Sequence, residues 1–339
     1  MTDSIMLRLV IVLLAATSSL AGCCAVGPRT ELDDQALPSW REGESRTAII
    51  DFVRRTTRAE SPDFVPPADR IAVFDNDGTL WSEQPMYAQL AFALDRVRAE
   101  AGSHPEWATT APFSFVLEND MNGLAGSGMD GLVDLIVATH AGTDTETFQT
   151  TVTEWLDSAR HPVTDRRYDE MVYQPMLELL EFLREHDFQT WIVSGGGVDF
   201  MRVFVEEAYG IPPQQVIGSL GDLEFVSDDA GPRLERTGGI AFIDDEGGKP
   251  IGIWRSIGRR PILAVGNSDG DFEMLEWTTA GDGARLGVYL HHTDDEREVA
   301  YDRESSFGRL DRGLDEAGER GWIVIDMAED WGRVFPFAD

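Results

Sequence analysis

The chain has 339 residues, of which 42% are hydrophobic, so it is long enough to bury a large core. Its formal net charge is −33, and no basic stretch offsets the acidic excess. Nucleic acids and anionic membrane surfaces are therefore poor partners, because both repel an acidic protein. Lys249 is the only lysine, beside 27 arginines.

The N-terminus reads as a targeting segment. The run MLRLVIVLL is basic and then apolar, and it is short for a membrane span, which is typical of a signal-peptide core. It leads to LAGC, which ends at Cys23 and resembles a bacterial lipobox. We expect residues 1–23 to be a lipoprotein signal peptide, with a lipid anchor on Cys23 and residues 24–45 as a tether. This predicts an extracytoplasmic location, in the periplasm or at the cell surface; ordinary secretion and an uncleaved anchor are the alternatives.

The two cysteines, Cys23 and Cys24, both lie in this leading segment. The sequence after the tether therefore offers no disulfide and no thiol chemistry.

Short apolar runs followed by polar or glycine-rich motifs recur along the rest of the chain. IAVF runs into DNDGT, TWIV into SGGG, PILAV into GNSDGD, and LGVYL into His291 and His292. Such runs suit strands that are buried on both faces, and their alternation with helical stretches predicts an α/β fold. We expect a Rossmann-like parallel sheet with helices on both faces. Ligands bind outside the carboxyl ends of such strands, so the motifs should meet at one edge.

The segment 84–162 differs, because three stretches in it have helical spacing and no strand pattern intervenes. We interpret it as a helical cap inserted after the first strand, with a catalytic core of residues 46–83 and 163–339. The stretch MVYQPMLELLEFLREHDF predicts a helix with Pro175 in its first turn. VDFMRVFVEEAYG, after SGGG, predicts another helix that ends at Gly210.

A calcium loop is the first alternative for the acidic motifs. An EF-hand loop needs an acid at position 1 and a glutamate at position 12. Around DNDGT these positions hold Val73 and Gln84, and position 1 of GNSDGD is Val265. The sequence therefore argues against calcium loops.

Four motifs in this order resemble those of the haloacid dehalogenase superfamily. DNDGT resembles the first motif, Ser194 with its glycines the second, Lys249 in EGGKP the third, and GNSDGD the fourth. The SGG form, the helical insertion and the GGK context look most like the phosphoserine phosphatase branch. The resemblance covers roughly residues 68–292.

The resemblance implies the following chemistry. Asp75 would attack phosphorus and form an aspartyl phosphate, and Asp77 would protonate the leaving oxygen and later deprotonate water. Ser194 and the backbone N–H groups of Gly195 and Gly196 would bind phosphoryl oxygens at a helix start. Lys249 would place a positive charge against Asp75 and the phosphate.

A Mg²⁺ ion is the implied cofactor, because two carboxylates would otherwise repel a phosphate. The expected ligands are the Asp75 side chain, the Asp77 backbone carbonyl, Asn267 and Asp271, with Asp269 in reserve. Many relatives have an aspartate where this chain has Asn267. The alternative for the acids of GNSDGD is that they cap the helix that follows.

Substrate-contacting candidates follow the first motif. They are Thr79, Glu83 and Gln84. In this region phosphoserine phosphatases carry a glutamate that binds the substrate amine. That glutamate's position is Gln84 here, and the asparagine of the family's fourth motif is replaced by Gly270, which argues against L-phosphoserine. His291 and His292 are expected to be structural.

The predicted function is a Mg²⁺-dependent phosphomonoester hydrolase acting on a small extracytoplasmic substrate. The alternatives are a non-catalytic lipoprotein that keeps the fold and binds a ligand, and a phosphotransferase that passes the phosphate to an alcohol. The sequence makes no prediction of oligomeric state.

Overall fold

The structure of the protein is a computed structural model that describes residues 36–338. The predicted signal peptide, Cys23 and most of the tether lie outside the described residues. Within them, none of the helices combines the length and the apolar character that crossing a bilayer requires.

A seven-stranded sheet forms the core, in the order β4-β3-β2-β1-β5-β6-β7. All neighbours pair in parallel except β3 and β4, which are antiparallel. The predicted α/β class with a parallel sheet is confirmed. The strands are β1 Ile71–Phe74, β2 Gln189–Gly197, β3 Val216–Asp228, β4 Gly231–Phe242, β5 Leu263–Gly266, β6 Leu286–His291 and β7 Ile323–Asp326.

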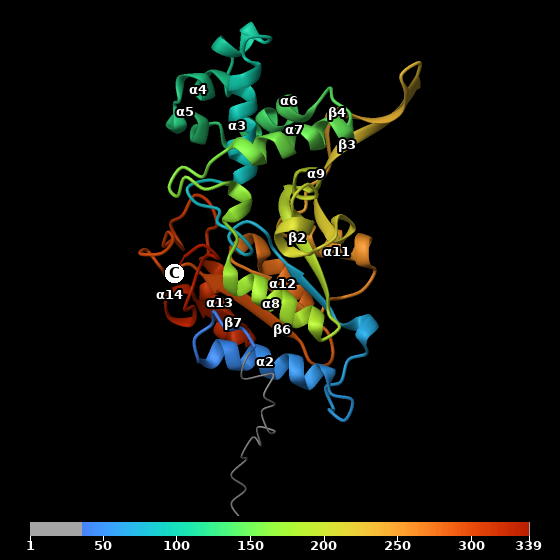
Figure 1. Cartoon of the computed structure of the whole chain (residues 1–339), viewed down its shortest axis with the longest axis vertical. Helices are drawn as coiled ribbons and strands as arrows, with labels where there is room; N and C mark the ends of the chain where they lie inside the picture. The colour runs from blue at the N-terminus through green and yellow to red at the C-terminus, as the bar shows by residue number, and fades with distance from the viewer. Residues whose placement is uncertain (1–35, 339) are drawn as a thin grey trace, which may run out of the picture. The chain divides into compact units, whose positions relative to one another are not determined.

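Helices cover both faces of this sheet, as Figure 1 shows. The core helices are α2 Glu44–Thr57, α8 Gln174–Glu185, α9 Val198–Met201, α10 Val205–Tyr209, α11 Gly248–Ile257, α12 Phe272–Thr279, α13 Arg312–Arg320 and α14 Met327–Asp330. Residues from α2 and α8 share one apolar cluster with Ala72 and Phe74 of β1. Ile71 and Val73 face the other way, into a second cluster with α11 and α12. Because successive side chains of a strand alternate, the fully buried β1 serves both layers.

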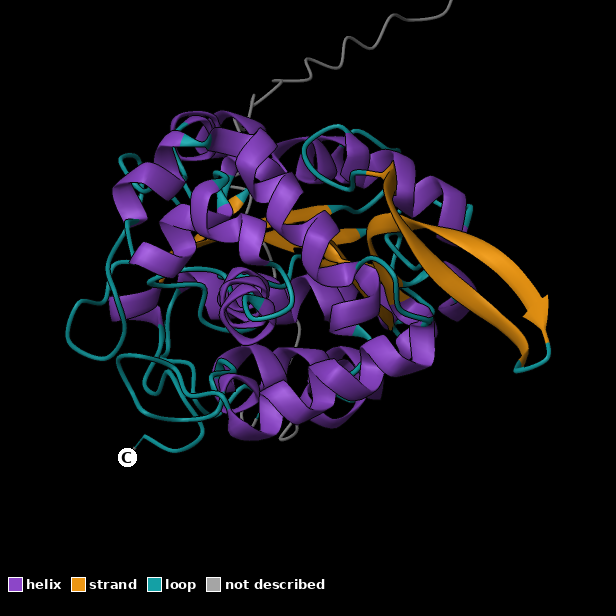
Figure 2. Ribbon diagram, turned by 90° about the horizontal axis from the view of Figure 1, so that it is seen from above, coloured by secondary structure: helices purple, strands orange, loops and turns teal. Residues whose placement is uncertain are grey.

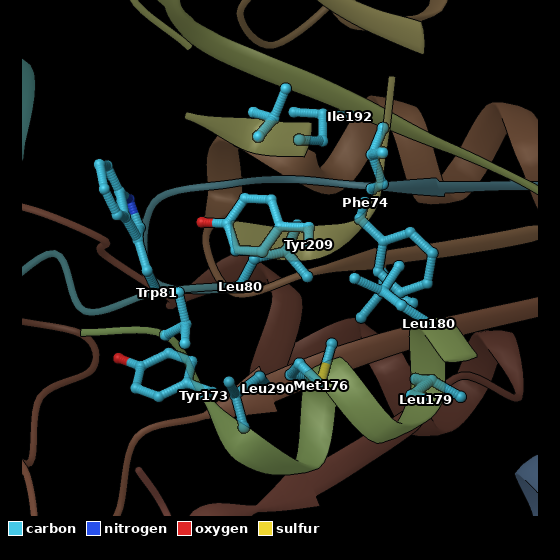
Figure 3. Packing of buried hydrophobic residues seen from close by; sticks show 14 of the residues in the cluster. Phe74, Leu80, Trp81, Tyr173, Met176, Leu179, Leu180, Ile192, Tyr209 and Leu290 are labelled. Atoms are coloured by element: carbon cyan, nitrogen blue, oxygen red, sulfur yellow. The ribbon is translucent and has the colours of Figure 1, made fainter. Parts of the chain in front are cut away.

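The helix α8 shows how the sequence pattern produces this packing. Its buried residues Met176, Leu179 and Leu180 recur at helical spacing and lie against Phe74 and Ile192 of the two central strands (Figure 3). Pro175 lies in the first turn, as predicted.

The segment between β1 and α8 contains the predicted helices. They are α3 Ala88–Glu100, α4 Phe113–Glu118, α5 Met121–Gly126, α6 Gly128–His140 and α7 Thr145–Ser158. They lie beyond the carboxyl end of the sheet (Figure 1). We call this group of helices the cap.

A long β-hairpin, absent from the sequence prediction, also contributes to this side of the molecule. β3 begins as a core strand parallel to β2 and then continues, paired antiparallel with β4, past the sheet (Figure 2). The hairpin is tied to the cap by backbone hydrogen bonds: Gly142 N–H donates to Arg236 O at 2.9 Å, and Arg236 N–H donates to Thr143 O at 3.0 Å. Two separate parts of the chain, the cap and the β3–β4 hairpin, therefore lie together beyond the carboxyl end of the sheet.

Two boundaries differ from the prediction. The described end of the predicted tether is packed on the core: Leu37 and Trp40 are buried, and the Trp40 ring contacts Trp331. The tether prediction is wrong for that part, because two large apolar side chains find a place on the core. The single helix predicted after SGGG is two short ones, α9 and α10, so the second motif does not open a long helix.

Candidate active site

The DNDGT loop leaves β1 through a tight turn that only glycine fits. Asp75 follows the strand and its N–H donates to Val265 O at 2.9 Å, which ties the loop to β5. Gly78 has φ +75°, and a Cβ there would lie 2.1 Å from Asn267 Nδ2 and 2.3 Å from Glu83 Oε1. A side chain at Gly78 would therefore be both strained and obstructed. The turn keeps Asp75 and Asp77 against the other motifs.

Lys249 connects three motifs through one ammonium group. It is the second residue of α11, and its Nζ lies 2.7 Å from Asp75 Oδ1 and 2.5 Å from Asp271 Oδ1. It also donates to Val193 O at 3.1 Å. The side chain is 3% exposed. Burial alone lowers the pKa of Lys249, but the carboxylates of Asp271 and Asp75 raise it above the usual lysine value, so the group stays charged.

The GNSDGD loop divides its polar groups between the site and the fold. Asp271 Oδ2 accepts from the N–H groups of Asn267 at 3.0 Å and Ser268 at 3.1 Å, while its other oxygen binds Lys249. Its carboxylate does not cap α12 itself, but it completes a capping box with Ser268 at the 3-10 turn Asp269–Asp271 that leads into α12, so the capping alternative holds in part. Asp269 instead accepts N–H groups of Asp311, Arg312 and Gly313 at the start of α13. These hydrogen bonds hold its carboxylate at the start of α13.

The second motif lies beside the first. The Ser194 hydroxyl is buried and accepts the N–H of Gly196 at 3.1 Å. A Cβ built on Gly196 would lie 3.3 Å from Ser194 Oγ and 3.7 Å from Asp77 Oδ2, so these groups surround a small space. Gln89 of the cap, which the sequence analysis did not single out, accepts the N–H of Gly197 at 2.7 Å.

The predicted substrate-contacting residues differ in whether their side chains face the substrate space. Thr79 donates to Asn267 Oδ1 at 3.0 Å and is fully buried. Gln84 points to the segment after β6, where its amide donates to Phe307 O at 3.2 Å. Glu83 faces the site, but its carboxylate accepts from Tyr301 Oη and Asn267 Nδ2, both at 2.6 Å. The structure thus brings neither Thr79 nor Gln84 to the substrate space, and it gives Glu83 partners of its own.

One cavity of about 300 Å³ joins the motifs to the cap and the hairpin. Asp75, Asp77, Ser194 and Lys249 all line it. So do Gly195 and Gly196, together with side chains of α6 and of the β3–β4 hairpin. The sheet edge therefore forms one end of the cavity, and the cap and hairpin form the rest.

Burial controls the charge of the two aspartates. Burial, followed by the charge of Asp271, raises the pKa of Asp75, and the hydrogen bond from Lys249 offsets part of this. Burial also raises the pKa of Asp77, against the opposing effect of a hydrogen bond from Trp81 Nε1 at 2.9 Å. The protonated form of Asp77 is therefore favoured compared with an aspartate in water.

His292 supports the first motif from behind, a role that the sequence analysis missed beyond expecting a structural residue. Its Nε2 donates to Gly78 O at 2.7 Å, and its Nδ1 lies 3.4 Å from Glu298 Oε2. Ser82 Oγ at 2.8 Å and Tyr173 Oη at 3.2 Å donate to the same carboxylate. Although burial raises the pKa of Glu298, these partners lower it below its usual value, so the carboxylate stays ionised.

The residues present fit a hard divalent cation. Asp75 and Asp271 share a single ammonium group, and burial followed by the charges of Asp77 and Asp75 raises the pKa of Glu83, so the acids of the site repel one another and a divalent cation would relieve this repulsion. One Asp75 oxygen binds Lys249, and the other has no hydrogen-bond partner among residues 36–338. Within the same residues, no group of three His, Cys, Asp or Glu side chains is arranged to hold a metal. The expected ligands are a mixed set of carboxylate, amide and backbone oxygens, which Mg²⁺ accepts.

The sheet order and the four loops at its edge define an α/β protein of the haloacid dehalogenase type. The chain belongs to the haloacid dehalogenase-like hydrolases, whose family model matches residues 72–276. No curated protein matches the sequence.

Solved structures with a similar arrangement have low sequence identity. A protein of unknown function from Bordetella pertussis Tohama I is 15% identical, with 76% of this chain and 98% of that chain covered and a TM-score of 0.48. A phosphoserine phosphohydrolase-like protein from Francisella tularensis is 16% identical, with 74% and 98% covered and a TM-score of 0.37. A probable phosphoserine phosphatase from Vibrio cholerae is 18% identical, with 68% and 58% covered and a TM-score of 0.37.

Proposed function

We propose that this protein is a Mg²⁺-dependent phosphomonoester hydrolase that acts through an aspartyl phosphate on Asp75. The observation that carries the proposal is the arrangement of Asp75, Asp77, Ser194 and Lys249 at one end of a single cavity. A dehalogenase would not need a second carboxylate two residues after the nucleophile. A carboxyl group there, with its pKa raised by burial, suits proton transfer to an ester oxygen.

In the first half-reaction, a carboxylate oxygen of Asp75 attacks phosphorus and the ester bond breaks. Asp77 gives its proton to the departing oxygen, and the Trp81 indole holds the Asp77 carboxyl in position. Ser194 and the N–H groups of Gly195 and Gly196 bind phosphoryl oxygens, and the Gly196 N–H exchanges its hydrogen bond to Ser194 Oγ for one to the phosphate. Lys249 balances the negative charge that the phosphate brings beside Asp75.

In the second half-reaction, water attacks the phosphorus of the aspartyl phosphate, and Asp77 takes its proton. Free phosphate leaves and the Asp75 carboxylate is restored. Splitting the displacement into two steps lets one carboxyl group act first as an acid and then as a base.

Asp75, the Asp77 carbonyl, Asn267 and Asp271 would hold the Mg²⁺ ion, which supplies electrostatic stabilisation of the transferring phosphoryl group. Asn267 contributes no charge, and the acids around it make up for this.

The motif order and the cap insertion favour the phosphoserine phosphatase-like branch of the family. The LAGC motif supports a lipid anchor on Cys23 and an extracytoplasmic substrate, with a phosphate-scavenging role. Metabolic labelling with a radioactive fatty acid tests the anchor: the wild-type chain should carry the label, and Cys23→Ser should not.

The enzymatic proposal is tested by phosphate release from a panel of small phosphomonoesters, with the full chain, in Mg²⁺ and in EDTA. We expect release in Mg²⁺ only. Asp75→Asn should lower the rate on the order of 10⁴-fold or more, as removal of a covalent nucleophile does. Asp269→Asn is the matched control, because it changes an acid of the same motif set that caps α13 instead.

Failure of every ester to release phosphate would contradict the proposal and favour a ligand-binding protein. Release that falls when alcohols are added, with formation of new esters, would indicate a phosphotransferase.

A further inference from the structure

We infer that the substrate's leaving group is uncharged and mainly apolar, with no second anionic group. This inference rests on the proposed function, since it concerns the part of the ester that lies beyond the phosphate. Three features of the cavity support the inference. They are its apolar wall, the pairing of its cations with acids, and the two exposed acids that line it.

The wall opposite the sheet edge is apolar and comes from two separate elements. α6 contributes Leu132, Ile136 and Val137, which are half-buried, while Leu135 on the same helix is fully buried in the cap. The hairpin side contributes Leu220 and Ile240, which are 42% and 38% exposed. Large apolar side chains that face one cavity without being covered mark the place where an apolar ligand group gains most from leaving water.

Among the described residues, the lysine and the arginine that line the cavity are both already paired with acids. Lys249 is held between Asp75 and Asp271. The Arg236 guanidinium is ion-paired with Asp199, donates to His140 O at 3.1 Å, and lies 4.4 Å from the centre of the Phe148 ring. Among the described residues that line the cavity, these are the only lysine and arginine.

His140, which also lines the cavity, does not supply a charge either. Burial, followed by the charge of Arg236, lowers its pKa to about 3. Thr139 Oγ1 lies 2.9 Å from its Nδ1, and Gln89 Nε2 lies 3.5 Å from its Nε2. An uncharged ring can use one nitrogen as donor and the other as acceptor with these partners.

The acids of the cavity act against a second negative charge. The carboxyl groups of Asp222 and Asp245 line it and are exposed. A carboxylate or a second phosphate on the leaving group would be repelled by these two acids, with no unpaired cation beside them. Because both acids are exposed, water also screens their attraction for a cationic group.

The test compares three matched esters with the full chain in Mg²⁺: benzyl phosphate, 4-carboxybenzyl phosphate and 4-(trimethylammoniomethyl)benzyl phosphate. We expect kcat/KM for benzyl phosphate to exceed that for the carboxylate by at least tenfold and that for the cation by less. Equal values for benzyl and carboxybenzyl phosphate, or the highest value for the cationic ester, would overturn the inference.

The three corresponding phosphonates, titrated by calorimetry, separate this inference from the proposed function. If no ester is hydrolysed but the phosphonates bind in the expected order, the hydrolase proposal fails and the inference about the cavity stands. Phosphonates that bind equally well, or in the reverse order, overturn the inference whatever the activity.

A substitution that adds a cation to the wall sharpens the test. Ile136→Lys should shift the ratio of the carboxybenzyl to the benzyl value upward by at least fivefold. Ile251→Lys makes the same change at an exposed position of α11 that does not line the cavity, and it should leave the ratio unchanged. A folded Ile136→Lys protein with an unchanged ratio would contradict the inference.

Discussion

The two ends of the cavity differ in how their side chains are held. At the sheet edge, Lys249, Asp75 and Asp271 are buried and joined by short hydrogen bonds. At the cap and hairpin end, Ile136 and Leu220 are partly exposed and have no polar partners to fix them. The comparison indicates that hydrogen bonds fix the side chains where the proposed chemistry takes place. The side chains of the apolar wall at the other end are held only by packing, so they can adapt to the shape of a ligand.

Of these substitutions, Lys249→Arg should have the largest effect on kcat/KM. A small effect would show that the side chains at the sheet edge are not fixed as this comparison requires. The lysine fits a site 3% exposed between two carboxylates, and a planar guanidinium is larger and cannot place its charge at the same point. We expect kcat/KM to fall on the order of 10³-fold, as when an electrostatic donor is removed. Phosphate release under saturating and limiting ester measures this. Arg259→Lys, in an exposed ion pair, is the control and should change nothing.

His292→Ala should have the next largest effect, which is a loss in the free energy of unfolding. The substitution removes the donor to Gly78 O and leaves Glu298 buried without its nearby imidazole, although Ser82 and Tyr173 still donate to the carboxylate. Leaving a buried carbonyl without its donor costs roughly 1–3 kcal/mol. Urea unfolding should show this loss.

The exposed His104–Glu106 pair provides the matched control, since His104→Ala should leave the unfolding midpoint unchanged. Equal effects of the two substitutions would mean that the buried pair does not support the DNDGT loop.

Asp244→Asn should change the pH dependence of stability. Asp244 is fully buried, and its carboxylate oxygens have no hydrogen-bond partner within residues 36–338. Burial, opposed by Lys249 and reinforced by Asp245, raises its pKa to about 7. In the unfolded chain the pKa is near 4. The folded state therefore holds a proton that the unfolded state has lost, so this group makes stability fall as pH rises from about 4 to about 7.

The substitution removes that fall. At pH 8 the variant should be more stable than the wild type by a few kcal/mol, at roughly 1.4 kcal/mol per pKa unit, and at pH 4 the two should be equal. Asp229→Asn, at the exposed turn between β3 and β4, should keep the slope of the wild type. A constant difference across pH would contradict the account of Asp244.

Ile136→Ala should have the smallest effect, which is a rise in KM. It tests the comparison at the cap and hairpin end of the cavity. Shortening one wall residue removes part of the apolar contact with the leaving group, worth about 1.4 kcal/mol, or tenfold in KM, with kcat little changed. Ile251→Ala is the control. A loss of kcat with unchanged KM would mean that the wall takes part in the chemistry itself.

The sequence could predict the sheet edge because its information is local. Each motif directly follows an apolar strand, and a lone lysine among arginines drew attention to Lys249, which the structure places beside Asp75. The cap helices were also visible from their spacing.

The remaining features depend on contacts between distant positions. Glu83 binds Tyr301, which is 218 residues away, and His292 meets Gly78 across 214 residues. The β3–β4 hairpin was missed although its residues around DDAG have the polar turn that joins two strands. Thr79 and Gln84 were assigned to the substrate from their place after the first motif, and tertiary packing turned them to Asn267 and Phe307 instead.

The central claim is that Asp75 carries the phosphoryl group during turnover. The full chain, mixed with a hydrolysed ester and Mg²⁺, can be quenched in acid within the first turnover, digested and examined by mass spectrometry. The account predicts one phosphoryl group on the peptide that contains Asp75, absent from Asp75→Asn. Phosphate release without any phosphorylated peptide, or with the phosphoryl group on another residue, would contradict it.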